Sequence, residues 1–396
     1  MNYILFDDHS WKDLLPLTYT RPIAELRIGI FKIKEKWEKY LEANISYKTQ
    51  PYLEKKYPLI IKEDNVFINA SIIPNKELVN EIANLDKGQK LISKDELIAL
   101  RLTKNEAESN TEKLMSSKTA INTKSSLLKI KYPWDIFKHN GSELENDFNI
   151  ITKTSEPGKI NTSNNIINKN NIFVEKGASL EYVTLNAKNG PIYIGKEAEI
   201  MEGAIIRGPF ALCDHSVVKI SAKIYGPTTI GPHSKVGGEI NNSVIQGYSN
   251  KAHDGFLGNS VIGEWCNLGA DTNNSNLKNN YAEVKIWNYL KEKFINTGLQ
   301  FCGLIMGDHS KCGINTMFNT GTVVGVNANI YGSGFPRNFI PSFSLGGASG
   351  YTNYALNKAF EVAEKVMARR RIDFDDVEKN ILKYIYEDTA KYRKRF

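Results

Sequence analysis

The residues most able to carry out chemistry lie in a polar, glycine-containing stretch, residues 237–280, that holds a single histidine, His253. Lys251 and Asp254 flank this histidine, and Gly255 follows. An imidazole gains or loses a proton near neutral pH, so a histidine on an irregular part of the chain is a candidate general base. A surface or hydrogen-bonded structural histidine is the alternative, and the residues alone leave it open.

The elements that must position this stretch show a six-residue repeat. A helix repeats every 3.6 residues and a strand every two, so a period of six indicates a short extended segment followed by a corner. Three such sides close a triangular coil with one aliphatic side chain per side pointing inward, which is the hexapeptide parallel β-helix. A β-sandwich with chance spacing is the alternative, and eight successive matches disfavour it. The eight positions are Ile194, Ile200, Ile206, Leu212, Val218, Ile224, Ile230 and Val236.

The repeat is lost after Val236 and is expected to return in a shifted register. The predicted inward positions there are Val244, Phe256, Ile262 and Leu268, then Met306, Cys312, Phe318, Val324 and Ile330, with Val174 and Leu180 leading in. Aliphatic side chains fill the inside of such a coil. A binding site must therefore lie on its outer face, between coils or between subunits, and the polar breaks in the repeat are the places to search.

Composition divides the chain into four parts. Residues 1–150 mix short apolar strands with helical patterns and are expected to form an α/β domain, in which residues 104–131 are a loose surface excursion. Residues 151–171 are rich in Asn, Ser and Thr and are expected to be a linker, followed by the β-helix over residues 172–345. Residues 346–396 carry many charges at helical spacing, which predicts a helical tail.

The overall composition argues against several classes of protein. No run of 18 or more apolar residues occurs, so no membrane span is expected. The four cysteines form no CxxC pair or tight cluster, which fits a reducing cytoplasm and argues against a metal site. The net charge of +7 is compatible with phosphorylated substrates and does not by itself indicate nucleic acid. We therefore expect a cytoplasmic protein with small-molecule substrates and with no nucleic-acid or membrane partner.

Residues 253–276 carry a motif with a known counterpart. They include His253, Phe256 and Gly258, then Val261-Ile262-Gly263, then Asn267, Gly269-Ala270, Thr272 and Asn276. In these residues and this spacing, the chain resembles the C-terminal acetyltransferase domain of the bifunctional N-acetylglucosamine-1-phosphate uridyltransferase/glucosamine-1-phosphate acetyltransferases and related sugar-1-phosphate nucleotidylyltransferases. The resemblance covers roughly residues 190–330. It implies a left-handed β-helix, a homotrimer, and acetyl-CoA bound between subunits.

The resemblance also implies a role for each matching residue. His253 corresponds to the base that takes a proton from the sugar amino group as it attacks the thioester. Asn267 and Asn276 correspond to residues that hold the amino sugar and the acyl group, and Ala270 corresponds to a backbone position near the acetyl group. Phe256 stands where better-known members have a tyrosine that contacts the sugar phosphate.

The expected contacts to phosphate differ from those of the family. Asn241 stands in place of a phosphate-binding lysine one coil earlier, so Lys219, Lys223 and Lys251 are candidates to supply the positive charge. The basic clusters at residues 369–371 and 391–395 are expected to be solvated helix faces. Contact with coenzyme A phosphates is the alternative for these clusters.

The N-terminal part resembles nucleotidylyltransferases of the same kind through residues 16–22, PLTYTRP. The glycine-rich loop that cradles nucleotide phosphates in those enzymes is replaced by residues 6–12, FDDHSWK, and a motif lysine is replaced by Ile23. This arrangement resembles a divergent bacterial branch of sugar nucleotidyltransferases that carry a β-helix. A relic domain that folds without turnover is the alternative.

That resemblance implies five candidate residues in the N-terminal domain. Arg21, Arg27 and Lys32 are candidate phosphate contacts, and Asp7 or Asp8 is a candidate Mg²⁺ ligand.

The predicted function combines the two resemblances. The β-helix is expected to acetylate an amino-sugar 1-phosphate, with glucosamine-1-phosphate as the favoured acceptor. The N-terminal domain is expected to transfer a nucleotidyl group to the sugar phosphate with Mg²⁺, giving a product such as UDP-N-acetylglucosamine. One alternative is a single-activity nucleotidylyltransferase or acetyltransferase, and another is a non-catalytic trimeric scaffold.

Overall fold

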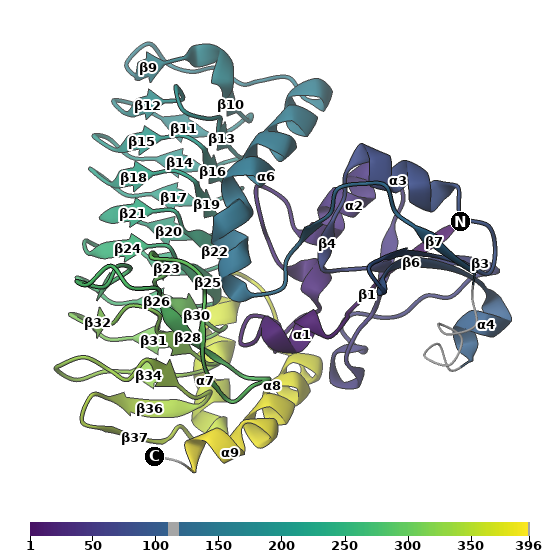
Figure 1. Ribbon diagram of the computed structural model, residues 1–396. Helices are drawn as coiled ribbons and strands as arrows, with labels where there is room; N and C mark the ends of the chain where they lie inside the picture. Colours follow the sequence, from purple (N-terminus) through teal and green to yellow (C-terminus); the bar gives the residue numbers. More distant parts are fainter. Residues whose placement is uncertain (110–118, 395–396) are drawn as a thin grey trace. The chain divides into compact units, whose positions relative to one another are not determined.

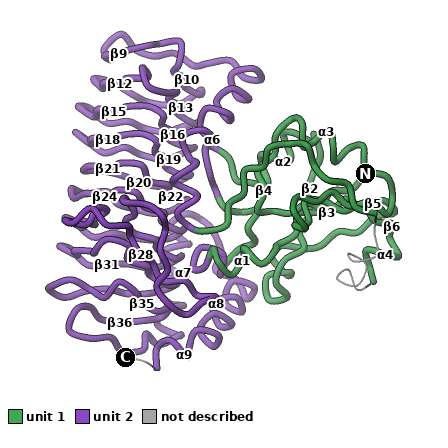
Figure 2. The backbone as a smooth tube through the Cα atoms, viewed as in Figure 1, with its two compact units in different colours: residues 1–14, 20–26, 31–132 green, residues 15–19, 27–30, 133–396 purple. Residues whose placement is uncertain are grey.

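The structure is a computed structural model that describes residues 1–109 and 119–394. The chain forms two compact units, which Figure 2 shows in two colours. The first unit comprises residues 1–14, 20–26 and 31–132, and the second comprises residues 15–19, 27–30 and 133–396. Among the described residues, no helix combines the length and the apolar character needed to cross a bilayer.

The first unit is an α/β fold around a six-stranded sheet. Its strands lie in the order β2 (Ile45–Lys48), β1 (Asn2–Phe6), β3 (Asp64–Asn69), β6 (Glu96–Thr103), β5 (Gln89–Ser93) and β7 (Thr119–Asn122). β1 is parallel to both β2 and β3, whereas β6 runs antiparallel to β3. Ile4, Phe67 and Leu100 pack together in one core of this unit because the strands place alternate side chains on one face.

Four α-helices, a short strand pair and the 3₁₀ helices Ile23–Glu25 and Pro51–Leu53 complete the described part of the first unit. The α-helices and the strand pair are α1 (Ser10–Asp13), α2 (Ile33–Leu41), α3 (Lys76–Ala83), α4 (Lys104–Glu108), and the antiparallel pair β4 (Ile72–Ile73) and β8 (Leu128–Lys129). The expected surface excursion over residues 104–131 contains α4, β7 and β8, and its residues 110–118 lie outside the described part of the chain.

The second unit is built on the left-handed parallel β-helix that the repeat and the resemblance predicted (Figure 1). Its first sheet contains β10 (Ile172–Val174), β13 (Ile192–Ile194), β16 (Phe210–Leu212), β19 (Thr228–Ile230), β22 (Val244–Gly247), β25 (Val261–Glu264), β30 (Ile305–Met306), β33 (Val323–Val324) and β35 (Phe339–Ile340). Its second contains β11 (Ser179–Leu180), β14 (Glu199–Ile200), β17 (Val217–Val218), β20 (Lys235–Val236), β23 (Asn250–Lys251), β26 (Asn267–Leu268), β31 (Lys311–Cys312), β34 (Asn329–Ile330), β36 (Ser344–Gly347) and the antiparallel β37 (Gly350–Asn353). Its third contains β9 (Asn165–Ile167), β12 (Thr184–Asn186), β15 (Ile205–Arg207), β18 (Lys223–Tyr225), β21 (Glu239–Asn241) and β24 (Phe256–Gly258), and the pair β27 (Asn273–Asn274) and β32 (Met317–Phe318) follows.

The interior of the β-helix confirms the six-residue repeat. All eight aliphatic positions from Ile194 to Val236 belong to one buried core, with exposed fractions of 2% or less. Each is stacked in register on its equivalent in the next coil, as Ile206 is on Ile224. The stacked positions exclude water along the whole column, and this burial is the main source of the stability of the coil.

The predicted register is wrong by one residue at two positions after Val236. The core contains Ile245 and Leu257, whereas the sequence analysis placed Val244 and Phe256 inside. The cause is a shortened corner, because the successive inward residues Val236 and Ile240 are four positions apart instead of six. A five-residue step then leads from Ile240 to Ile245, the six-residue spacing holds from Ile245 to Leu257, and a second five-residue step leads from Leu257 to Ile262.

The second unit also contains a helix that packs on the β-helix, a hairpin inserted between its coils in sequence, and a helical tail. Helix α6 (Pro133–Thr154) packs against β19, β22 and β25, and residues 27–30 bond to it through the Asn140 amide oxygen, which accepts from the Gly29 amide at 2.8 Å. The expected arm over residues 271–300 contains the hairpin of β28 (Lys285–Asn288) and β29 (Lys293–Asn296). The tail forms α7 (Leu356–Ala368), α8 (Asp376–Asp388) and α9 (Ala390–Arg393).

The bounds of these parts differ from the ranges expected from composition. The helix expected to close residues 1–150 is α6, which is grouped with the second unit together with residues 15–19 and 27–30. The expected linker begins inside this helix, which runs to Thr154, and it contains β9, which pairs with β12 of the β-helix. The contacts of α6 with β19, β22 and β25 account for this grouping.

Candidate functional site

A pocket of about 660 Å³ on the β-helix brings three of the predicted site residues together. His253, Asn267 and Ala270 all line it. Tyr248 and Trp265, whose rings stack with centroids 4.3 Å apart, form part of the wall. The remaining lining residues are Lys235, Asn250, Ala252, Cys266, Leu268, Gly269, Lys311, Ile314, Val366, Arg369 and Arg370.

His253 lies on the irregular turn that joins β23 to β24, and its side chain is exposed. Gly255 allows this turn because its φ is +113°, a value that residues with a side chain rarely adopt. A Cβ at this position would also lie 2.2 Å from the carbonyl oxygen of Thr272 in the next coil. The turn is therefore packed tightly against its neighbour, and its tip presents the imidazole to the pocket.

Lys251 was a predicted phosphate contact, but the structure places its side chain inside the coil. It is 2% exposed and pairs in register with the inward Val236. Its ammonium donates to the carbonyl oxygens of Gly237 at 3.1 Å, His253 at 2.6 Å and Asp254 at 3.2 Å. A side chain held in this way does not reach a ligand on the outer surface.

Positive charge at the pocket comes from residues that the sequence analysis largely missed. Lys235 in β20 and Lys311 in β31 line the pocket from the two coils that flank β23 and β26, and Arg369 and Arg370 line it from the end of α7. Burial lowers the pKa of Lys311 to about 8, and its ammonium donates to the His309 carbonyl at 2.8 Å. Only the arginines carried a sequence signal, the basic cluster 369–371.

The other acetyltransferase candidates lie away from this pocket wall. The Asn276 amide donates to Asn259 Oδ1 at 2.8 Å, and neither Asn276 nor Phe256 is among the lining residues. Lys219 and Lys223, which precede the turn by two coils, do not line the pocket either. The cluster at residues 391–395 is described only to Lys394, and there Lys391 bonds to Glu292 at 2.5 Å.

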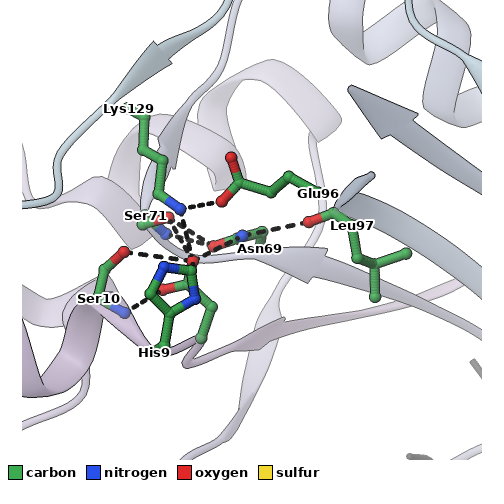
Figure 3. A network of polar contacts seen from close by, with 8 residues as sticks. His9, Ser10, Asn69, Ser71, Glu96, Leu97 and Lys129 are labelled. Carbon is green, nitrogen blue, oxygen red and sulfur yellow. Dashed lines mark hydrogen bonds and ion pairs between the residues drawn. The ribbon is translucent and has the colours of Figure 1, made fainter. Parts of the chain in front are cut away.

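A second pocket, of about 810 Å³, lies in the first unit at the end of β1. Asp8 lines this pocket, and Figure 3 labels residues that surround it, among them Ser10, Asn69 and Lys129. Asp8 Oδ2 accepts from the Lys129 ammonium at 2.7 Å and from the Asn69 amide at 3.2 Å, and Oδ1 accepts from the Ser10 amide at 2.9 Å. Burial alone would raise the pKa of Asp8, but Lys129 and these hydrogen bonds hold it below its ordinary value.

Asp7 lies in the same pocket and has the opposite electrostatic character. Its carboxylate accepts from the Thr49 hydroxyl at 2.6 Å and from the Ile23 amide at 2.9 Å. Burial raises the pKa of Asp7 to about 7 in spite of these two bonds, and the neighbouring Asp8 adds to the rise. One carboxyl of the pair is thus held charged by a lysine, and the other titrates near neutral pH.

These carboxylates do not fit a magnesium ion held by the protein alone. Both oxygens of Asp7 and both oxygens of Asp8 already accept hydrogen bonds, and the Lys129 ammonium occupies the space where a cation would approach Asp8 Oδ2. Within residues 1–109 and 119–394, no group of three or more His, Cys, Asp or Glu side chains is arranged to hold a metal ion.

The three predicted phosphate contacts are not brought into this second pocket. Lys32 pairs with Glu25 at 2.7 Å, and Arg21 is buried elsewhere in the first unit. Arg27 belongs to the second unit, where its side chain donates to the carbonyl oxygens of Gln246 and Ile30. The basic residues that do line the pocket are Lys48, Lys94, Lys129 and Lys131.

Comparison with known proteins defines the class of the N-terminal part. Residues 3–156 match the model of a family described as sugar nucleotidyl transferase. The chain is 31% identical over 144 residues to a bifunctional sugar-1-phosphate nucleotidylyltransferase/acetyltransferase of Sulfurisphaera tokodaii. This match covers 36% of this chain and 35% of that protein. It is 30% identical over 195 residues to the bifunctional protein GlmU of Methanocaldococcus jannaschii. This match covers 49% of this chain and 41% of that protein.

These matches confirm the predicted resemblance to the GlmU-like bifunctional transferases. The chain spans between a third and a half of the length of these curated relatives. A solved UDP-N-acetylglucosamine acyltransferase from Francisella novicida aligns with 60% of this chain and 92% of its own, at 12% identity and with a TM-score of 0.29.

Proposed function

We propose that the β-helix pocket transfers an acetyl group from acetyl-CoA to the amino group of an amino-sugar 1-phosphate. The observation that carries this proposal is the convergence of His253, Asn267 and Ala270 on one wall of a pocket. Lys235, Lys311, Arg369 and Arg370 surround that wall with positive charge, which suits ligands that bear phosphates. Glucosamine-1-phosphate is the acceptor that the resemblance favours.

The proposed reaction uses His253 as a general base. The nitrogen lone pair of the sugar amine attacks the thioester carbonyl, a C–N bond forms and the C–S bond breaks. His253 takes the proton that the amine loses, and the departing coenzyme A thiolate takes a proton in turn. The exposed imidazole suits this role because it must reach an acceptor that enters from solvent. The Asn267 amide on the neighbouring coil is placed to orient the acyl group or the sugar.

We further propose that the first unit transfers a nucleotidyl group to a sugar 1-phosphate. The family match to residues 3–156 and the pocket around Asp8 support this activity. Lys48, Lys94, Lys129 and Lys131 are proposed to hold the phosphates of the nucleotide and the sugar, in place of the residues expected from the sequence. The nucleotide base and the sugar are left to experiment.

A single-activity acetyltransferase is the second candidate function. The observation that favours it is the set of hydrogen bonds that already occupies Asp7 and Asp8, together with the replacement of the glycine-rich loop by residues 6–12. The two candidates make different predictions for one pair of assays. The first assay measures thiol release from acetyl-CoA with a panel of amino sugars, and the second measures pyrophosphate release from a panel of nucleoside triphosphates with Mg²⁺.

The expected outcome is activity in both assays. Thiol release without pyrophosphate release would leave the single-activity enzyme. Release of neither product with any acceptor would overturn the proposal in favour of a scaffold. Assembly as a homotrimer and a cytoplasmic location are also proposed, on the resemblance to trimeric family members and on the free cysteines.

A further inference from the structure

Lys251 lies at a position of the β-helix that otherwise carries apolar residues. Ile245, Lys251 and Leu257 are successive inward residues of one coil, each six positions from the next. A charge buried in an apolar interior is costly unless hydrogen bonds compensate it. Such a residue therefore calls for a reason other than packing, because a leucine or methionine would fill the same space at lower cost.

The contacts of the Lys251 ammonium indicate that reason. Two of its three acceptors, the carbonyl oxygens of His253 and Asp254, belong to the turn that carries the proposed base. The third, the Gly237 carbonyl oxygen, belongs to the shortened corner of the preceding coil. The lysine thus ties the turn to the rigid coil beneath it at two successive peptide groups.

The imidazole of His253 has no other support of this kind. In the part of the chain that the structure describes, no hydrogen bond holds its ring nitrogens, so the position of the ring depends on the position of its own backbone. The turn has further anchors beyond His253, because the Asp271 amide donates to the Asp254 carbonyl oxygen at 3.1 Å and the Glu239 amide donates to the Gly255 carbonyl oxygen at 3.2 Å. The carbonyl of His253 itself is bonded by Lys251 alone among the described residues.

We propose that Lys251 is a positioning residue for acetyl transfer, which holds the backbone of His253 so that the imidazole points into the pocket. This inference rests on the proposed function, since it assigns a partner to its general base. A general base loses much of its effect when it is misplaced by an ångström or less. Removal of the ammonium should therefore reduce turnover, while the binding residues Lys311 and Asn267 stay in place.

The decisive experiment compares Lys251→Met and Lys251→Gln with the parent enzyme. Methionine fills the inward space without a charge or a donor, and glutamine keeps an N–H donor without the charge. We expect Lys251→Met to lower kcat for thiol release at least tenfold, with the KM for acetyl-CoA within twofold and the melting temperature not reduced. Lys251→Gln should lose less than the methionine variant. A decrease in kcat at an unchanged KM shows that the variant stabilises the transition state less well and still binds the substrate normally.

Three controls separate this role from a merely structural one. Ile224→Ala, at an inward position remote from the turn, should lower the melting temperature without lowering kcat of the folded enzyme. Lys188→Met, at an exposed lysine, should change neither quantity. Lys251 variants with normal kcat, or with a loss of kcat that only follows a loss of stability, would overturn the inference. If His253→Ala keeps its turnover, the assignment of His253 as the general base fails, and the inference fails with it, whereas absence of thiol release from the parent enzyme with every acceptor would overturn the proposed function itself.

Discussion

Lys129 Nζ lies 2.7 Å from Asp8 Oδ2, and the same ammonium also bonds to Glu96. This lysine comes from β8, far in sequence from the acidic pair that follows β1. It keeps one carboxylate of the second pocket charged, and the hydrogen bonds that it donates to both carboxylates raise its own pKa in spite of burial. Asp8 was predicted to bind a magnesium ion, and in the structure the Lys129 ammonium is the cation that it contacts.

Lys129→Met should therefore reduce pyrophosphate release at least tenfold and leave thiol release unchanged. Its loss should also destabilise the first unit at neutral pH, because the charged Asp8 would lose its main partner. The folded pKa of Asp8 lies below its unfolded value, so the stabilisation it supplies is present above the unfolded pKa and is lost as the pH falls through the folded pKa. Parallel assays and thermal melts test both effects, with the exposed Lys55→Met as the control.

Asp7 should give the first unit a pH dependence of the opposite sign. Its folded pKa is raised to about 7, so the folded state holds a proton between about pH 4 and 7 that the unfolded chain does not. The contribution of this group to stability is therefore greatest at low pH and declines as the pH rises to about 7. Asp7→Asn should raise the melting temperature at pH 8 and have little effect at pH 4. A variant that is less stable than the parent at pH 8 would contradict the assignment.

Arg27 illustrates how a motif residue can have a structural role. Its side chain donates to the carbonyl oxygens of Gln246 and Ile30, and its backbone amide donates to Gln246 Oε1. Arg27→Ala should lower the free energy of unfolding by about 1–3 kcal/mol, because buried carbonyl oxygens lose their donor. The KM for the nucleotide should stay within twofold of the parent. A large rise in this KM without a loss of stability would instead support the phosphate contact predicted from the sequence.

The oligomeric state remains a prediction that light scattering can test directly. The resemblance implies a trimer, so the purified protein at micromolar concentration should have about three times the 44.6 kDa mass of one chain. A monomer at this concentration would contradict the trimer and any site that depends on a second subunit.

The sequence could predict the fold of the β-helix because burial alone selects its inward residues. Every sixth residue faces the interior when the corners have equal length, and Ile194 to Val236 satisfy that condition. The pattern could not choose between Val244 and Ile245, since both are aliphatic and both are buried. The choice depends on the four-residue step from Val236 to Ile240 and on the five-residue step from Ile240 to Ile245, which are properties of two individual corners. The same uncertainty hid the inward position of Lys251, because this lysine faces the interior only in the register of Ile245 and Leu257.

The candidate site could be predicted only where its residues are close in sequence. His253, Asn267 and Ala270 lie on adjacent coils within one motif, and the structure brings them to one pocket. Lys235 and Lys311 reach the same pocket from coils separated by the arm over residues 271–300, and no local pattern marks them. Their approach follows from the stacking of β20, β23, β26 and β31 in one sheet, which is a tertiary property.

The last prediction concerns His253 itself. An amine must be neutral to attack the thioester, and a positioned imidazole can remove the proton as the C–N bond forms. General-base catalysis of this kind contributes about 10²–10⁴-fold to the rate, so His253→Ala should lower kcat for thiol release by at least two orders of magnitude. This loss corresponds to about 3 kcal/mol or more in the activation barrier. The melting temperature should change little, because the side chain is exposed and contributes nothing to the core.

Ile224→Ala is the matched control, because its side chain is 1% exposed in the interior of the same β-helix. It should cost about 2–5 kcal/mol of stability through the cavity that it leaves, with normal turnover by the molecules that remain folded. The two variants therefore separate the chemistry of the pocket from the stability of the coil. Near-normal turnover by His253→Ala with its best amino-sugar acceptor would show that the general base lies elsewhere. In that case acetyl transfer would stand, and the base would have to be sought among the other residues that line the pocket.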